Sequence, residues 1–210
     1  MILQETNNNV IEKKLNQRWK ELPYLYKIQI FAYLLAGICE AIAYPITTKL
    51  IYGTVEIDTL ASRLVLSSLI GVILSLLWLN MQEKLYNLFI HFTVIECICY
   101  ISLITYVIIF NNYDSYLILS TIIGGTIARI VNGAGSKLHQ QITDNEQYRT
   151  DYIFFIQIVA SVGVLLGSTI AVCFPITATI SFIFLLISLI GFQITDVYIF
   201  KKVKQRKLNN

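Results

Sequence analysis

Residues 116–136, YLILSTIIGGTIARIVNGAGS, form an apolar segment long enough to cross a bilayer, and one charged residue, Arg129, lies inside it. An arginine in the hydrocarbon layer costs about 2.5 to 3.5 kcal/mol on insertion scales, so it is expected to face a polar cavity or an acidic partner. Asn132 and Gly133 follow on the same face of a helix, with Gly135 just beyond them. The segment therefore predicts a spanning helix with one polar face, on which the glycines leave open space.

The rest of the chain has the same apolar character. Apolar residues make up 56% of the sequence and charged residues 14%, whereas roughly 25% of the residues in soluble domains are charged. A spanning helix needs about 20 apolar residues, and six segments meet that length: 27–51, 60–79, 86–110, 116–136, 152–173 and 177–200. The sequence thus predicts an all-α integral membrane protein with six transmembrane helices.

Charged residues outside the spans predict the orientation. Lysine and arginine are concentrated before the first span and after the last, whereas the expected outer connections carry only acidic charges: Glu56, Asp58 and Asp114. Because Lys and Arg are enriched in cytoplasmic flanks, we expect both termini on the cytoplasmic side of a cell membrane. The basic residues form no surface interleaved with aromatic residues, so the expected partners are membrane lipids and not nucleic acid.

These patterns divide the chain into three parts. Residues 1–26 form a leader in which Ile11, Leu15, Trp19 and Leu22 recur at helical spacing, which predicts a short amphipathic helix at the membrane surface. Residues 27–200 form the six-span bundle, and residues 201–210 form a basic cytoplasmic tail. None of the connections is long enough to fold as a domain.

Acidic side chains inside the expected spans are the candidate functional groups. Glu40 lies near the middle of the first span and is followed by Pro45, which can kink the helix and open its backbone to a cavity. Glu96 and Arg129 lie at similar depths, so either glutamate could pair with the arginine. For Glu40 and Arg129, a structural ion pair and a proton or substrate site both stay open, while Glu96 is interpreted as structural. Asp196 lies close to the basic tail and is expected to be solvated.

The order of these features resembles the fourth and fifth transmembrane helices of the major facilitator superfamily. That family's fourth-helix motif has an arginine, two residues, a glutamine, a glycine, one residue and often a second glycine. Here asparagine replaces the glutamine, and the spacing is kept. The matching residues, including the polar loop and the glycine-rich fifth helix that follow, are Arg129, Asn132, Gly133, Gly135, Asp144, Glu146, Arg149, Gly163 and Gly167. A role in helix packing or gating is expected for the small residues and the proline of the expected spans: Gly133, Gly135, Gly163, Gly167 and Pro45.

Three features depart from that family. Residues 80–86, NMQEKLY, lack its glycine-rich basic loop, and Ser168 stands where many antiporters of the family have a proline. Family members also pair two six-helix halves around a cavity, whereas this chain has the length of one half. The resemblance therefore implies a homodimer or a separate second half.

The leading hypothesis is a half-size secondary transporter component, in which Glu40 and Arg129 line a cavity and couple protonation to movement of a small solute. The alternatives are a non-transporting accessory or immunity protein, a truncated transporter remnant, and, from Ala32 and Ala36, the substrate-binding subunit of a vitamin transporter. We expect no enzyme, cofactor or metal site, because the two histidines lack a well-placed nucleophile or paired ligands and no nucleotide motif is present.

Overall fold

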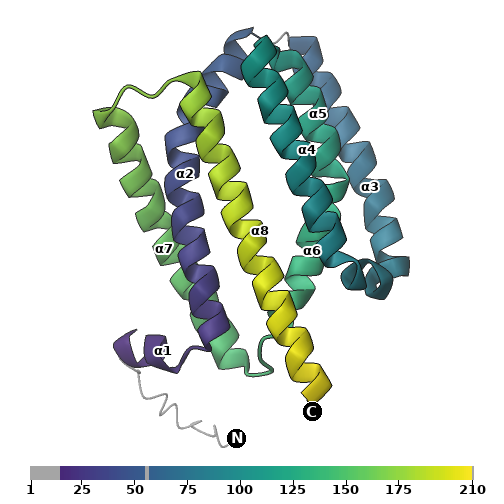
Figure 1. Cartoon of the computed structure of the whole chain (residues 1–210), viewed down its shortest axis with the longest axis vertical. Helices are drawn as coiled ribbons and strands as arrows, with labels where there is room; N and C mark the ends of the chain where they lie inside the picture. Colours follow the sequence, from purple (N-terminus) through teal and green to yellow (C-terminus); the bar gives the residue numbers. More distant parts are fainter. Residues whose placement is uncertain (1–14, 55–56, 210) are drawn as a thin grey trace, which may run out of the picture.

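The computed structural model describes residues 15–54 and 57–209, and these residues form helices joined by short connections (Figure 1). No strand occurs among them, so the predicted all-α class is confirmed for the described residues. The helices are α1 Leu15–Glu21, α2 Tyr24–Thr54, α3 Ile57–Asn87, α4 Phe89–Phe110, α5 Tyr113–Gly125, α6 Ile127–Gln140, α7 Glu146–Cys173 and α8 Ala178–Asn209.

Five segments of the described chain are long and apolar enough to cross a membrane. They are Tyr24–Leu50, Phe89–Phe110, Tyr113–Gln140, Glu146–Cys173 and Ala178–Lys207. The expected second span, 60–79, lies within α3, whose apolar part is the shorter segment Ala61–Leu74. The structure therefore supports an all-α, multi-pass membrane protein, and the sixth crossing stays a prediction.

The fourth expected span is interrupted. α5 ends at Gly125 and α6 begins at Ile127, with Thr126 between them in a non-helical conformation (φ −105°, ψ −88°). The preceding pair, Gly124 and Gly125, has low helix propensity, which makes a break at this point inexpensive. Arg129 and Asn132 therefore lie on a separate short helix, whose rotation is not fixed by that of α5.

α1 and the last turns of α8 lie at the same end of the bundle (Figure 1), which we call the terminal end; the opposite end is the loop end. α1 packs there through Trp19, whose ring meets those of Phe31 and Phe155 edge-on, and Arg18 pairs with Asp151 at 3.4 Å.

α2 begins at Tyr24, inside the expected leader, and the expected basic tail continues α8 as a helix. Ile11 and Glu56 lie outside the described residues.

The helices form two groups on either side of a central region. α2 packs most extensively against α7 and α8, which together we call the α2 group. α3, α4, α5 and α6 pack on one another and form the α4 group (Figure 1). At the terminal end a buried apolar cluster joins the groups, with members such as Ile30, Phe89, Leu138 and Ile199.

α2 and α7 approach closely because glycines lie in their contact. A Cβ atom placed on Gly163 would lie 2.8 Å from the carbonyl oxygen of Leu34, and one on Gly37 would lie 3.1 Å from that of Ala160. Gly167 has the tightest surroundings of the three, against the carbonyl oxygen of Ile38. Small residues at such positions let helix backbones pack directly on one another in a membrane.

Candidate binding cavity

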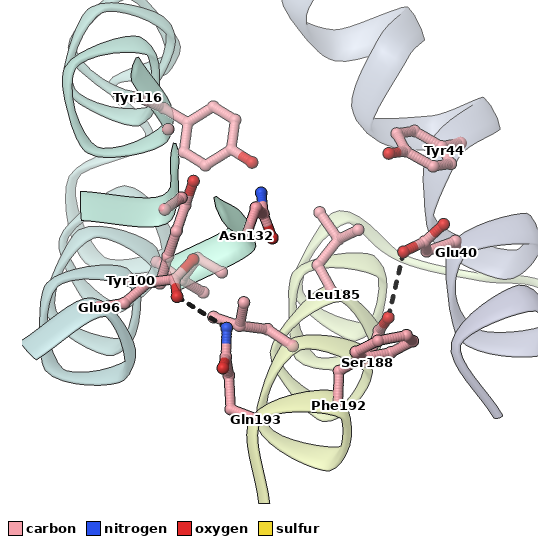
Figure 2. Close-up of a pocket in the computed structure, with 14 residues that line it drawn as sticks. Glu40, Tyr44, Glu96, Tyr100, Tyr116, Asn132, Leu185, Ser188, Phe192 and Gln193 are labelled. Atoms are coloured by element: carbon pink, nitrogen blue, oxygen red, sulfur yellow. Dashed lines mark hydrogen bonds between the residues drawn. The ribbon is translucent and has the colours of Figure 1, made fainter. Parts of the chain in front are cut away.

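A cavity of about 490 Å³, which we call the central cavity, lies between the α2 group and the α4 group (Figure 2). Its lining comes from α2, α4, α5, α6 and α8, so both groups contribute to its walls. Polar and aromatic side chains dominate it: Glu40, Tyr44, Glu96, Tyr100, Tyr116, Asn132, Ser188, Phe192 and Gln193. The apolar bundle thus contains a polar space whose walls belong to separate helix groups.

The two glutamates enter the central cavity from opposite groups (Figure 2). Glu40, half-buried on α2, accepts a hydrogen bond from Ser188 Oγ at 3.2 Å. Glu96, on α4, is only 3% exposed and accepts a hydrogen bond from Gln193 Nε2 at 2.7 Å. This second hydrogen bond joins α4 of one group to α8 of the other.

Gln193 has only part of its hydrogen-bonding capacity satisfied. Its Nε2 donates to Glu96, but its Oε1 is buried and has no hydrogen-bond partner among the described residues. A buried acceptor left without a donor costs about 1 to 3 kcal/mol. The side chain belongs to the cavity lining, but this oxygen is itself buried and does not face the cavity.

A second cavity, of about 510 Å³, adjoins the central cavity and extends toward the loop end, so we call it the loop-end cavity. It shares Tyr44, Tyr100 and Tyr116 with the central cavity and adds the start of α3 and the end of α2. Arg63 lines it and donates its Nε–H to Thr121 Oγ1 at 2.9 Å. Polar lining therefore continues from the central cavity toward one end of the bundle.

The structure brings together only some of the residues singled out from the sequence. Glu40, Glu96 and Asn132 line the central cavity, whereas Arg129 belongs to neither lining. Its guanidinium lies against α3, where a Cβ atom placed on Gly71 would be 2.7 Å from Nη1. In the part of the chain that the structure describes, no ion pair joins Arg129 to Glu40 or Glu96, so the expected pairing is not formed.

Helix rotation explains where Arg129 points. Ala128 and Asn132 are four residues apart on α6 and both line the central cavity. Arg129 follows Ala128 by one residue, which turns its side chain by about 100° around the helix axis. A helical projection places Arg129 and Asn132 on roughly the same face, but in the structure they have different neighbours. Arg129 lies against α3, and Asn132 lines the cavity.

The remaining small residues of the expected motif lie in other surroundings. Gly135 is buried and faces α8, where a Cβ atom would lie 3.5 Å from Asp196 Oδ2. Gly133 is half-buried on the same helix. Pro45 is exposed, and α2 continues through it to Thr54. A gating role for these residues stays a prediction.

Arg149 makes several contacts in the expected polar loop, which connects α6 to α7. It donates Nη2–H to the carbonyl oxygens of Gln140 and Thr143 at 3.0 and 2.8 Å, which fastens the end of α6 to the start of α7. Its ion pair with Asp144 is longer, at 3.9 Å, and Asp144 is exposed. Glu146 is exposed in the first turn of α7, where its charge is favourable at the helix N-terminus.

We expect the Arg149→Ala variant to be less stable by about 1 to 3 kcal/mol, because two loop carbonyls lose a charged donor. Asp144→Ala should change stability by less than about 0.5 kcal/mol, because exposed ion pairs contribute little. Thermal unfolding of both variants in the same detergent measures the difference. Equal losses would mean that the ion pair, and not the carbonyl contacts, holds the loop.

Sequence reasoning missed a buried polar cluster at the terminal end, which we call the terminal polar cluster: Gln29, His139, Tyr152 and Asp196. Tyr152 OH donates to Gln29 Oε1 at 2.8 Å, and Gln29 Nε2 donates to Asp196 Oδ1 at 2.9 Å and also contacts His139 Nε2. The expectation that Asp196 is solvated is wrong, because it is buried and bonded to α2. The available signal was Gln29, a polar residue within the first apolar segment.

Arg63 was also missed. It lies within the expected second span, where a charged residue indicates a polar partner or a cavity. Its contact with Thr121 and its place in the loop-end cavity agree with that rule.

Comparisons of the chain with protein-family models, with curated proteins and with solved structures find no match.

Proposed function

We propose that the protein is a half-size secondary transporter component of the major facilitator type, which moves a small solute by way of the central cavity. The observation that carries this proposal is a polar cavity whose walls come from two helix groups and hold Glu40 and Glu96. Ionisable residues that face a cavity inside a membrane commonly mark solute or ion pathways. Solute sites of secondary transporters also lie between helical repeats near the bilayer midplane.

The proposal includes a sixth crossing by α3 and an orientation with both termini in the cytoplasm. α3 runs along the bundle beside α5, and α1 lies at the same end as the last turns of α8 (Figure 1). A chain that begins and ends on one side crosses an even number of times. The basic residues near the terminal end, such as Lys201, Lys202 and Lys204, favour the cytoplasmic side of a cell membrane for that end.

Access to the cavity differs at the two ends of the bundle. The terminal end is occupied by the buried apolar cluster and the terminal polar cluster, whereas the loop-end cavity continues the polar lining in the other direction. With the proposed orientation, this arrangement corresponds to a state that faces outward. Pairing with a second copy or another six-helix half is part of the proposal and rests on the family resemblance, because the observed cavity lies within one chain.

Uptake into vesicles tests the proposal. The purified protein, reconstituted in proteoliposomes, is offered a panel of labelled amino acids, sugars, organic anions and amines. We expect uptake of at least one solute class above that of empty vesicles. Glu96→Gln, which keeps the size of the side chain but removes its ionisable carboxyl group, should reduce this uptake by about tenfold or more.

Asp114→Asn is the matched control, because Asp114 is exposed at the start of α5 and outside both cavity linings. It should transport like the unmodified protein. Uptake that is unchanged in Glu96→Gln would remove the central cavity from the pathway. A protein that inserts and folds but moves nothing from the panel would favour the non-transporting accessory alternative.

A further inference from the structure

The acidic and basic residues that line the central cavity indicate which solutes it can hold. Two glutamates line it, and no lysine, arginine or histidine occurs among its described lining residues. Arg63, the basic residue of the adjoining loop-end cavity, donates to Thr121 and not to either glutamate. A solute in the central cavity therefore meets acidic groups without a basic counter-ion in the same lining, which favours a cation and disfavours an anion.

Aromatic rings add to this preference. Tyr44, Tyr100, Tyr116 and Phe192 belong to the same lining as the glutamates. In Figure 2, Tyr44 lies near Glu40, while Tyr100 and Tyr116 lie toward Glu96. The faces of aromatic rings attract organic cations, and this attraction is stronger where water is excluded. Inorganic ions would not use such rings as well as an ammonium group with an apolar body does.

The carboxylates of the lining narrow the choice of cation further. Gln193 Oε1 is buried and does not face the cavity, whereas Glu40 and Glu96 both line it. A quaternary ammonium ion has no N–H group to offer a carboxylate, whereas a protonated amine has up to three. A protonated amine therefore fits the lining better than a quaternary ion of similar size.

We propose that the central cavity binds a protonated organic amine with an apolar body. Its ammonium group is held by the carboxylate of Glu96, Glu40 adds an acidic group on the opposite wall, and its apolar part lies against the aromatic rings. The volume of about 490 Å³ is within the range of small-molecule sites, about 300 to 1,000 Å³. The inference deepens the proposed transport function and rests on it for the role of the amine as transported solute.

Three probes of nearly equal size and different charge test the binding step. Isothermal titration calorimetry of the full chain in lipid nanodiscs compares 2-phenylethylammonium, neutral 3-phenyl-1-propanol and anionic 3-phenylpropionate, with empty nanodiscs subtracted. We expect saturable binding of the ammonium ion that is at least about tenfold tighter than that of the other two probes. N-trimethylated phenylethylammonium should bind more weakly than the parent amine.

Variants connect that binding to the cavity. Glu96→Gln should weaken binding of 2-phenylethylammonium by about tenfold or more, and Glu40→Gln should also weaken it. Asp114→Asn removes one exposed negative charge and should leave binding unchanged. A thermal unfolding transition like that of the unmodified protein shows that each variant is folded. Equal affinity for all three probes, or full binding by Glu96→Gln, would overturn the inference.

Flux measurements separate this inference from the proposed function. If vesicles take up an anionic or neutral solute through the cavity but neither bind nor move amines, the transport proposal stands and the amine proposal fails. If 2-phenylethylammonium binds in a manner that depends on Glu96 but no flux follows, the amine site stands and the transport proposal fails. Saturable uptake of the amine that is lost in Glu96→Gln supports both.

Discussion

Replacing Gly167 with leucine is expected to separate α7 from α2 and to lower the stability of the protein by about 3 kcal/mol or more. A Cβ atom at this position would overlap the carbonyl oxygen of Ile38 and lie 2.8 Å from Ala41 Cβ. Both neighbours are fixed to the backbone of α2, so no side-chain rotation can relieve the overlap. In the second half of α7 the buried residues are Gly163 and Gly167, so few other contacts compensate.

Gly53→Leu is the matched control for Gly167→Leu. Gly53 lies near the end of α2, and among the residues that the structure describes a Cβ atom there meets nothing within 4 Å. Because leucine has a higher helix propensity than glycine, this variant should be as stable as the unmodified protein or slightly more stable. Thermal unfolding and unfolding in increasing fractions of denaturing detergent measure both variants. Equal stability of the two would show that the α2–α7 contact adapts to a side chain.

The second large effect is expected for Gln29→Leu, in the terminal polar cluster. Gln29 is fully buried and accepts from Tyr152 OH while donating to Asp196. Leucine has a similar size but offers neither group, so the Tyr152 hydroxyl loses its acceptor and the Asp196 carboxylate loses its hydrogen-bond donor and, among the described residues, keeps only His139, at 3.8 Å. A buried polar group left without a partner costs about 1 to 3 kcal/mol, and more if it is charged. We therefore expect a loss of about 2 to 5 kcal/mol.

Gln157→Leu makes the same chemical change at an exposed position of α7 and should leave stability nearly unchanged. Hydrogen–deuterium exchange adds a local readout for Gln29→Leu. Exchange should rise first in residues 136–142, where α6 contacts the cluster through His139. A uniform rise along all helices would indicate general destabilisation and would argue against a cluster that closes the terminal end.

The helical segments could be predicted because the sequence features that indicate them depend only on nearby residues. The expected fourth span, 116–136, falls within the observed segment Tyr113–Gln140, and the expected fifth and sixth spans fall within or close to α7 and α8. Apolar length and flanking charges depend only on neighbouring residues. The break at Thr126 was not predicted, although Gly124 and Gly125 were a visible signal for it.

The candidate site could be predicted only in part. Glu40 and Glu96 were found because a carboxylate in an apolar segment is visible in the sequence, and depth along a helix follows from its rise per residue. Their hydrogen-bond partners were not found, because Ser188 and Gln193 lie on α8, far away in the sequence. The expected partner, Arg129, instead lies against α3.

The sequence by itself determined that this is a helical membrane protein with acidic residues at depth, because hydrophobicity and helical periodicity are properties of each segment alone. Only the tertiary structure decided which helix faces meet. Gln29 and Asp196 are 167 positions apart and form one hydrogen bond, while Arg129 lies only three residues from Asn132 and contacts a different helix. These outcomes depend on how each helix is rotated and packed against its neighbours, and no single segment encodes that rotation.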